Sequence, residues 1–245
     1  MATRYHIGAK ELRGELSAYA KRFDLLEVRP PSAEQPKVGP TLATLKKWRK
    51  AAPPHFEFVV VLGPAVGRLK ASPELETELA TALAAATALQ SRCILLATPA
   101  EVTPTALSRD RIARLLERLP RDATQIAWEP RGVWETEDAA VWARKWGVAL
   151  SVDPTREPVP AGPVAYARLR ALGEARSFGP AALERVTQAI GDRREAYVVI
   201  DSPTALAECK KLRQLSQRTA AKDGGRGRVI RPRNLTLKVR DDEQE

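Results

Sequence analysis

Short apolar runs alternate with longer helical patterns along most of the sequence, and this alternation constrains the fold more than any other feature. The runs are bounded by turn residues and rich in Val, Ile, Leu and Ala, which is typical of buried strands. Strands that alternate with helices form a parallel sheet, and eight such units predict a closed α/β barrel of the TIM type, (β/α)8. The eight strands are expected at Tyr5–Gly8, Leu25–Arg29, Phe56–Leu62, Cys93–Ala97, Thr124–Glu129, Val148–Asp153, Val164–Leu169 and Ala196–Asp201.

Helical patterns fill most of the gaps between these strands. Ser72-Pro73 and Ser202-Pro203 each place a serine at a cap position and a proline in the first turn of a helix. The segment 154–163 is proline-rich and too short for a helix, so a loop is expected between the sixth and seventh strands. The helices are expected at Glu11–Lys21, Thr41–Ala51, Pro73–Gln90, Ser108–Leu119, Glu135–Trp146, Pro180–Ile190 and Pro203–Gln217.

The chain divides by composition into a barrel, residues 1–216, and a basic C-terminal tail, residues 217–245. A length of 245 residues suits one large barrel. Residues 218–240 carry eight Lys or Arg against one acid, a composition that predicts disorder. Such a segment can bind nucleic acid by neutralising phosphates, or it can be a solvated extension. Both interpretations remain open for residues 218–240.

Charge and cysteine content limit the class of protein. The formal net charge is +10, which favours anionic partners. Two cysteines in so long a chain, Cys93 and Cys209, indicate buried apolar residues in a reducing compartment. The sequence shows no secretion signal and no run of apolar residues that could span a membrane, so a cytoplasmic protein without a membrane partner is expected.

The motifs that carry common cofactors and metals are missing from the sequence. There is no phosphate-binding glycine loop and no spacing of His, Cys and carboxylates that suits a metal, so we expect neither a cofactor nor a metal site. The two histidines, His6 and His55, lie early in the first strand and just before the third. Both fall toward the N-terminal end of the barrel, away from the face where barrel enzymes work, which indicates structural roles.

Charged residues gather at the C-terminal ends of the predicted strands. Side chains alternate along a strand, so the apolar set is expected to pack on the helices and the charged set to face the barrel axis. Ligand sites of such barrels lie at this C-terminal mouth. Two interpretations are open: a ligand pocket, or a network of ion pairs that closes the barrel. The inward-facing set comprises Glu27, Arg29, Glu129, Arg131, Asp153, Tyr166, Arg168 and Asp201.

Roles can be assigned to this set on chemical grounds. Without a histidine at the mouth, a catalytic reaction would depend on a carboxylate as general base, with Glu27 and Glu129 as the candidates. Arginines would neutralise an anionic group. The expected ligand-binding residues are Arg29, Arg131, Asp153, Arg168, Tyr166, Asp201 and Trp134. Trp134 follows the fifth strand closely enough to wall a pocket, and docking of a helix is the alternative role for it.

Several motifs, taken in their order along the chain, resemble a known family. They are Tyr19-Ala20-Lys21-Arg22-Phe23-Asp24-Leu25-Leu26-Glu27-Val28, Trp48 with Pro54-His55-Phe56-Glu57-Phe58, Thr98-Pro99, Trp128-Glu129-Pro130-Arg131 with Trp134, Gly147-Val148 leading to Asp153-Pro154, and Tyr166-Ala167-Arg168-Leu169. Across residues 3–216 the chain resembles the family called domain of unknown function 72, also known as YecE-like proteins. That resemblance implies a TIM-type barrel.

The departures from the family pattern bear on activity. Family members usually carry an asparagine near Arg29, a Glu-Leu-Arg-His where this chain has Glu129-Pro130-Arg131-Gly132, and a histidine at the position of Arg170. They also have Gly-Thr-Ser-Gly-Trp after the first strand, in place of Gly8-Ala9-Lys10-Glu11-Leu12, and a Lys and a Thr-His after the third strand, where this chain has Val61-Leu62-Gly63-Pro64. The mouth histidines of the family are therefore replaced.

These observations predict a barrel that binds a small anionic molecule, such as a sugar or phosphorylated metabolite, at its C-terminal mouth. The sequence leaves open whether the ligand is turned over. The alternative is a barrel without the family's chemistry that binds nucleic acid or an acidic partner through its basic tail.

Overall fold

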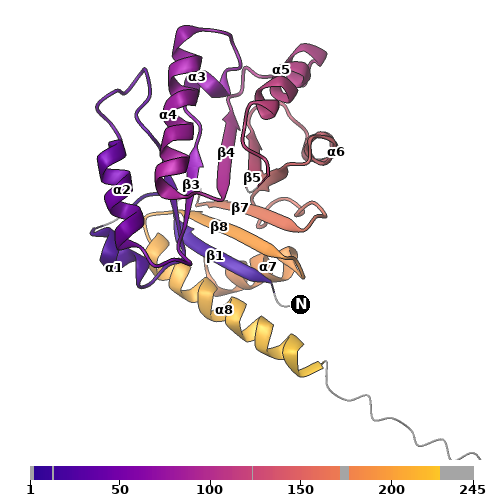
Figure 1. Ribbon diagram of the computed structural model, residues 1–245. Helices are drawn as coiled ribbons and strands as arrows, with labels where there is room; N and C mark the ends of the chain where they lie inside the picture. Colours follow the sequence, from indigo (N-terminus) through magenta and orange to yellow (C-terminus); the bar gives the residue numbers. More distant parts are fainter. Residues whose placement is uncertain (1–2, 13, 123, 172–176, 227–245) are drawn as a thin grey trace, which may run out of the picture.

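The computed structural model describes residues 3–12, 14–122, 124–171 and 177–226, with side chains up to Arg218. Eight parallel strands close into a barrel in the order β1-β2-β3-β4-β5-β6-β7-β8, and helices surround it (Figure 1). This confirms the predicted TIM-type fold. The strands are β1 (Arg4–Ala9), β2 (Leu25–Val28), β3 (Glu57–Val61), β4 (Cys93–Thr98), β5 (Gln125–Pro130), β6 (Ala149–Val152), β7 (Val164–Arg170) and β8 (Glu195–Asp201).

The helices follow the strands except between β6 and β7, where the predicted loop is found. Capping residues set several of their starts: the side chains of Thr41, Ser72 and Thr105 each accept a hydrogen bond from a backbone N–H in the first turn. The helices are α1 (Leu16–Ala20), α2 (Leu42–Ala51), α3 (Pro64–Gly67), α4 (Pro73–Leu89), α5 (Ala106–Glu117), α6 (Thr136–Trp146), α7 (Pro180–Ile190) and α8 (Ala205–Arg226).

Three helices differ from the sequence-based expectation. The first was expected from Glu11, but α1 begins only at Leu16 because Gly14 has a φ of 76°, which a right-handed helix cannot contain. The single turn α3 was not predicted, since four residues are too few to show a helical period. The last helix starts at Ala205, two residues after the expected Pro203.

The last helix also bears on the proposed domain boundary. α8 continues to Arg226 and projects from the barrel in Figure 1, so residues 217–226 extend a helix of the barrel domain. The remainder of the tail lies outside the described residues. Nucleic-acid binding by residues 218–240 therefore stays a prediction, as does the division of the chain at residue 216.

Side-chain alternation builds two separate apolar layers. The set that includes Leu26, Val60 and Trp128 packs between the strands and the helices. The opposite set fills the barrel axis and comprises Leu25, Val59, Val61, Cys93, Leu95, Ala127, Val164, Tyr166, Tyr197 and Val199. This is the alternation that the sequence predicted. Glu27, Glu129 and Arg168 each lie two residues beyond a member of the axial set, so their side chains also point toward the barrel axis.

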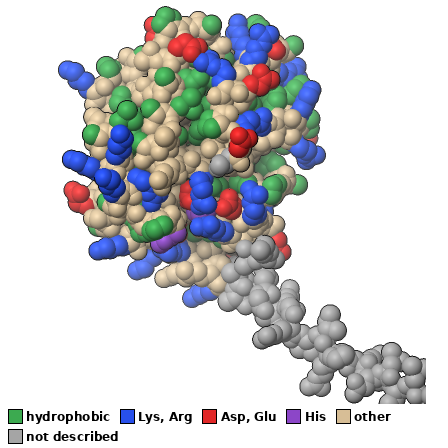
Figure 2. Space-filling model, viewed as in Figure 1, with side chains coloured by type: hydrophobic (Ala, Val, Ile, Leu, Met, Phe, Trp, Pro, Cys, Tyr) green, Lys and Arg blue, Asp and Glu red, His purple; other side chains and the backbone are tan. Residues whose placement is uncertain are grey.

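Other expectations concern the surface and the cysteines. Cys93 and Cys209 are buried and unpaired, as predicted. Among the described helices, none is both long and apolar enough to cross a bilayer. Figure 2 shows Lys and Arg side chains spread over the visible face, with acidic side chains between them.

Candidate functional site

Glu27 lies at the C-terminal end of β2, where its carboxylate is buried. Tyr166 from β7 donates its hydroxyl to Glu27 Oε1 over 2.6 Å, and Arg168 Nη2 donates to the same oxygen. Arg29 Nη2 donates to the other oxygen, Oε2, over 3.1 Å. Two strands that are not neighbours in the barrel, β2 and β7, are thus joined through a single carboxylate.

Arg168 stands at the centre of the mouth and joins two carboxylates. Its Nη2 reaches Glu27 and its Nη1 reaches Glu129 on β5, while the residue itself is 4% exposed. Glu129 also accepts hydrogen bonds from Arg170 Nη2 and, at 3.4 Å, from Arg131 Nε. The Nε of Arg168 is buried and has no hydrogen-bond partner among the described residues. A central guanidinium therefore retains one unused donor.

The electrostatics of this cluster keep Glu27 and Arg168 charged. Burial would raise the pKa of Glu27, but the charges and hydrogen bonds of Arg168, Arg29 and Tyr166 outweigh burial and lower it. Burial would likewise lower the pKa of Arg168, but Glu27 and Glu129 raise it. The pKa of Tyr166 is raised well above its ordinary value by burial and by Glu27. Glu27 is therefore ionised and Tyr166 is protonated at neutral pH.

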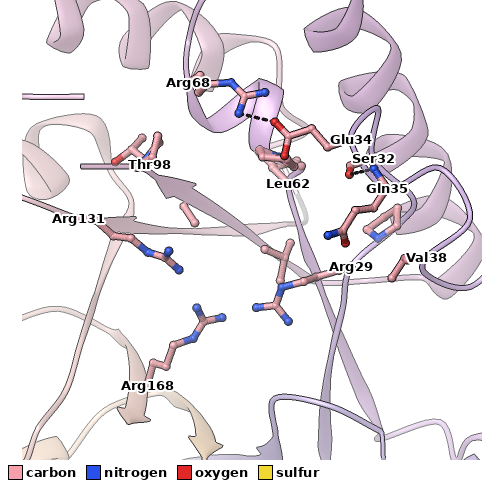
Figure 3. Close-up of a pocket in the computed structure, with 16 residues that line it drawn as sticks. Arg29, Ser32, Glu34, Gln35, Val38, Leu62, Arg68, Thr98, Arg131 and Arg168 are labelled. Carbon is pink, nitrogen blue, oxygen red and sulfur yellow. Dashed lines mark hydrogen bonds and ion pairs between the residues drawn. The ribbon is translucent and has the colours of Figure 1, made fainter. Parts of the chain in front are cut away.

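A pocket of about 330 Å³ opens beside this cluster at the ends of β2, β3 and β4. In Figure 3 the guanidinium groups of Arg29, Arg131 and Arg168 point into the same space. The side chains of Arg29 and Arg131 are 41% and 53% exposed, so both can be reached from solvent. The remaining lining residues are Pro30, Ser32, Glu34, Gln35, Val38, Val61, Leu62, Gly63, Pro64, Arg68, Ala97, Thr98 and Pro99.

Three of the nine residues that the sequence suggested line this pocket: Arg29, Arg131 and Arg168. Glu27, Glu129 and Tyr166 belong to the cluster around Arg168 without lining the pocket, and the remaining three have other partners. Asp153 Oδ1 accepts hydrogen bonds from Thr155, and its Oδ2 accepts one from the backbone N–H of Arg170, so it fixes the loop after β6. Asp201 pairs with Lys10 at 2.9 Å. Trp134 Nε1 donates to the carbonyl oxygen of Val102 and packs against Trp128, which docks the chain after β5.

Sequence reasoning missed the residues that loops bring to the pocket. Ser32, Gln35 and Arg68 line it from the segments after β2 and β3. Those segments are held by Glu78 on α4, which accepts hydrogen bonds from the backbone N–H groups of Ala33 and Ala65, each at 2.8 Å. The available sequence signal for this arrangement was Glu78 itself, a glutamate on the apolar face of a helix. The sequence did not show which loops its carboxylate would bind.

The two histidines lie at the opposite end of the barrel, as predicted. His6 is buried and stacks on Tyr197 with ring centroids 4.9 Å apart, and burial, with the charges of Arg4 and Arg92, lowers its pKa to about 3. Within the described residues, no group of three or more His, Cys, Asp or Glu side chains is placed to hold a metal ion.

Solved structures share this architecture. A DUF72 family protein from Enterococcus faecalis matches with a TM-score of 0.67 at 16% identity, over 89% of this chain and 98% of that one. A DUF72 family protein from Thermotoga maritima matches with a TM-score of 0.63 at 16% identity, over 88% and 99%. A xylose isomerase domain containing protein from Salmonella typhimurium has a TM-score of 0.56 at 15% identity, over 89% and 97%. At these identities the likeness shows the fold alone.

Sequence comparison identifies the family. Among curated proteins none matches this sequence. The sequence model of the family described as "Protein of unknown function DUF72" matches residues 2–232, almost the whole chain and slightly beyond the resemblance found by motif. The chain therefore belongs to the DUF72 family.

Proposed function

We propose that this barrel binds a small anionic molecule, a sugar derivative or a phosphorylated metabolite, in the pocket at its C-terminal mouth. The observation that carries the proposal is the convergence of Arg29, Arg131 and Arg168 on one pocket of about 330 Å³. Pockets for small molecules have volumes of roughly 300–1,000 Å³, so this one suits a compact metabolite. Guanidinium groups are the side chains best suited to planar recognition of phosphate or carboxylate oxygens.

A network that serves only to close the barrel would leave no guanidinium facing a cavity. Here the carboxylates lie beneath the pocket and hold the arginines, and Glu27 and Glu129 are absent from the pocket lining. The arginines lie between these carboxylates and the open space. This arrangement favours a ligand site over the purely structural interpretation.

The fold supports a sugar-like ligand by analogy only. The xylose isomerase domain containing protein and a D-tagatose 3-epimerase-like protein, with a TM-score of 0.58 at 12% identity, have the same architecture. Both names refer to sugars. In this chain, Ser32 and Gln35 line the pocket from the β2–α2 loop and offer partners for ligand hydroxyls.

Within this proposal the two carboxylates position the arginines. Glu27 has a lowered pKa and hydrogen bonds at both oxygens, so it is a weak proton acceptor. The general-base role expected for Glu27 or Glu129 stays a prediction. Binding is the activity for which the geometry provides an argument.

A thermal-shift screen of a metabolite library tests the proposal. A ligand at one hundred times its Kd stabilises the folded state by about 2.7 kcal/mol, which is readily measured. We expect anionic sugar derivatives among the hits, and we expect Arg131→Ala to abolish their effect. Arg114→Ala is the matched control, because Arg114 is an exposed arginine of α5 paired with Asp110. Hits that survive Arg131→Ala unchanged would refute the site.

A further inference from the structure

We infer that the pocket takes the dianionic headgroup of a phosphate monoester, held between Arg29, Arg131 and Arg168, with the body of the ligand extending toward Ser32 and Gln35. This inference rests on the proposed function and specifies the charge and shape of the ligand. It follows from the charge balance of the mouth and from the direction of the three guanidinium groups.

The mouth holds more positive charge than its own carboxylates balance. Four guanidiniums, from Arg29, Arg131, Arg168 and Arg170, contact only two carboxylates, Glu27 and Glu129. Two positive charges therefore lack a counter-charge in this cluster as far as the described residues extend. A ligand with two negative charges would neutralise the site.

The neighbouring acids do not cancel this excess, because each has a cation of its own. Asp153 lies 3.8 Å from Arg156, and Asp201 lies 2.9 Å from Lys10. On the far side of the pocket, Glu34 pairs with Arg68 at 2.7 Å. Arg168 pairs with Glu27, and Arg170, which lies outside the pocket lining, pairs with Glu129. The two uncompensated charges are then those of Arg29 and Arg131, which converge with Arg168 on the pocket in Figure 3.

The convergence distinguishes one compact headgroup from two separate charges. Arg29, Arg131 and Arg168 come from three different strand ends and point to a common space. A dicarboxylate would separate its two charges across the pocket, where the opposite wall carries the balanced Glu34–Arg68 pair. A tetrahedral phosphate presents three oxygens to three guanidiniums at one place and carries close to two negative charges at pH 7.

The wall across the pocket from Arg131 and Arg168 suits an uncharged polar body. Ser32 and Gln35 lie on the Arg29 side of the pocket in Figure 3, and Val38 and Leu62 add apolar surface. A short chain or ring bearing hydroxyl groups would fit this combination. The phosphate would then lie at the strand ends and the hydroxyls near the β2–α2 loop.

Isothermal titration of the full chain with two tetrahedral probes measures the charge requirement. Sulfate and methanesulfonate have similar headgroups but differ by one charge. At equal ionic strength we expect sulfate to bind at least tenfold more tightly, and we expect Arg29→Gln and Arg131→Gln each to reduce that ratio. Arg114→Gln, on the outer surface, should leave it unchanged.

A pH series with glycerol 3-phosphate identifies the phosphate dianion. The second pKa of a phosphate monoester is about 6, so the dianion fraction rises about tenfold between pH 5 and 7.5. We expect affinity to rise by a similar factor, while sulfate, a dianion throughout, reports any titration of the protein's own groups.

The outcomes separate this inference from the proposed function. Equal affinity for sulfate and methanesulfonate, or tighter binding of succinate than of glycerol 3-phosphate, would overturn the dianionic headgroup and leave an anion site in place. Failure of every anion to bind, with the same result for a folded Arg131→Ala variant, would overturn both. A sulfate preference together with the pH response of glycerol 3-phosphate would support both.

Discussion

The two ends of the barrel both bury charged groups, but they balance them differently. At the N-terminal end Glu57 pairs with Arg92, Asp24 pairs with Arg213 at 3.2 Å, and His6 is held neutral by burial. At the C-terminal mouth Arg168 bridges two carboxylates that further arginines also contact. The N-terminal pairs match one cation to one anion, whereas the mouth retains an excess of cations.

A column of side chains along the axis connects the two ends. His6 stacks on Tyr197, Tyr197 stacks on Tyr166 with centroids 6.1 Å apart, and Tyr166 donates to Glu27. The same interior thus carries a neutral histidine at one end and an ionised carboxylate at the other. The comparison teaches that matched pairs close a barrel, while an unmatched cluster beside a cavity marks the end that can bind a ligand.

The largest expected effect is a difference in the free energy of unfolding between substitutions at the two ends of the barrel. Arg168→Ala should lower the free energy of unfolding by about 3–5 kcal/mol, because it leaves Glu27 and Glu129 buried without their shared cation. Arg92→Ala, the matched change at the N-terminal end, should cost less, about 1–2 kcal/mol. It leaves only one buried carboxylate, Glu57, without its cation, and solvent reaches this site because the Arg92 side chain is 45% exposed. Urea denaturation measures both, and similar losses would contradict the comparison.

The next effect concerns the loops that make the pocket wall. Glu78→Ala removes two hydrogen bonds from a buried carboxylate to backbone N–H groups, and we expect a loss of about 2–3 kcal/mol. Anion binding should weaken as well, because Ser32 and Gln35 lose their support. Glu76→Ala on the exposed face of α4 is the control and should change neither quantity appreciably.

Acid should affect the N-terminal end first. The pKa of His6 falls from 6.5 to about 3 on folding, so the unfolded chain binds a proton between these values and the folded chain does not. Stability is therefore greatest above pH 6.5 and is lost as pH falls, by about 2 kcal/mol between pH 6.5 and 5. In the His6→Gln variant, stability should depend much less on pH between pH 6.5 and 5.

Glu27 at the mouth acts in a lower pH range. Its pKa is lowered from 4.5 on folding, so its contribution is present above pH 4.5 and is lost only as pH falls below that value. Unfolding curves collected from pH 7 to 3 on wild type and His6→Gln measure the difference. A wild-type profile that is flat between pH 6.5 and 5 would contradict the assignment of His6.

The smallest expected effect on stability is at the rim of the pocket. Arg131→Ala should change the free energy of unfolding by less than about 1 kcal/mol, because its contact with Glu129 is long and its side chain is 53% exposed. Its effect on anion binding should nevertheless be large. A stability loss as great as that of Arg168→Ala would place Arg131 in the structural network instead.

The sequence predicted which side chains face the barrel axis better than it predicted which of them belong to the site. Alternation along the strands correctly directed Glu27, Glu129 and Arg168 to the axis, because a strand has a fixed period of two. The same reasoning grouped Asp153 and Asp201 with them, but these two hold neighbouring residues in place. Side-chain alternation predicts the face of the strand on which a residue lies. It does not predict which partner a charged side chain at the rim will contact.

By itself the sequence determined the barrel, its eight strands, the loop between β6 and β7 and the position of both histidines at the N-terminal end, since these depend on local periodicity and chain order. Only the tertiary structure decided where the pocket opens. It lies at β2, β3 and β4, where Glu78 holds two loops and three arginines from distant strands meet. Those contacts join residues as far apart as Glu27 and Arg168, and no local pattern in the chain encodes their distance or charge balance.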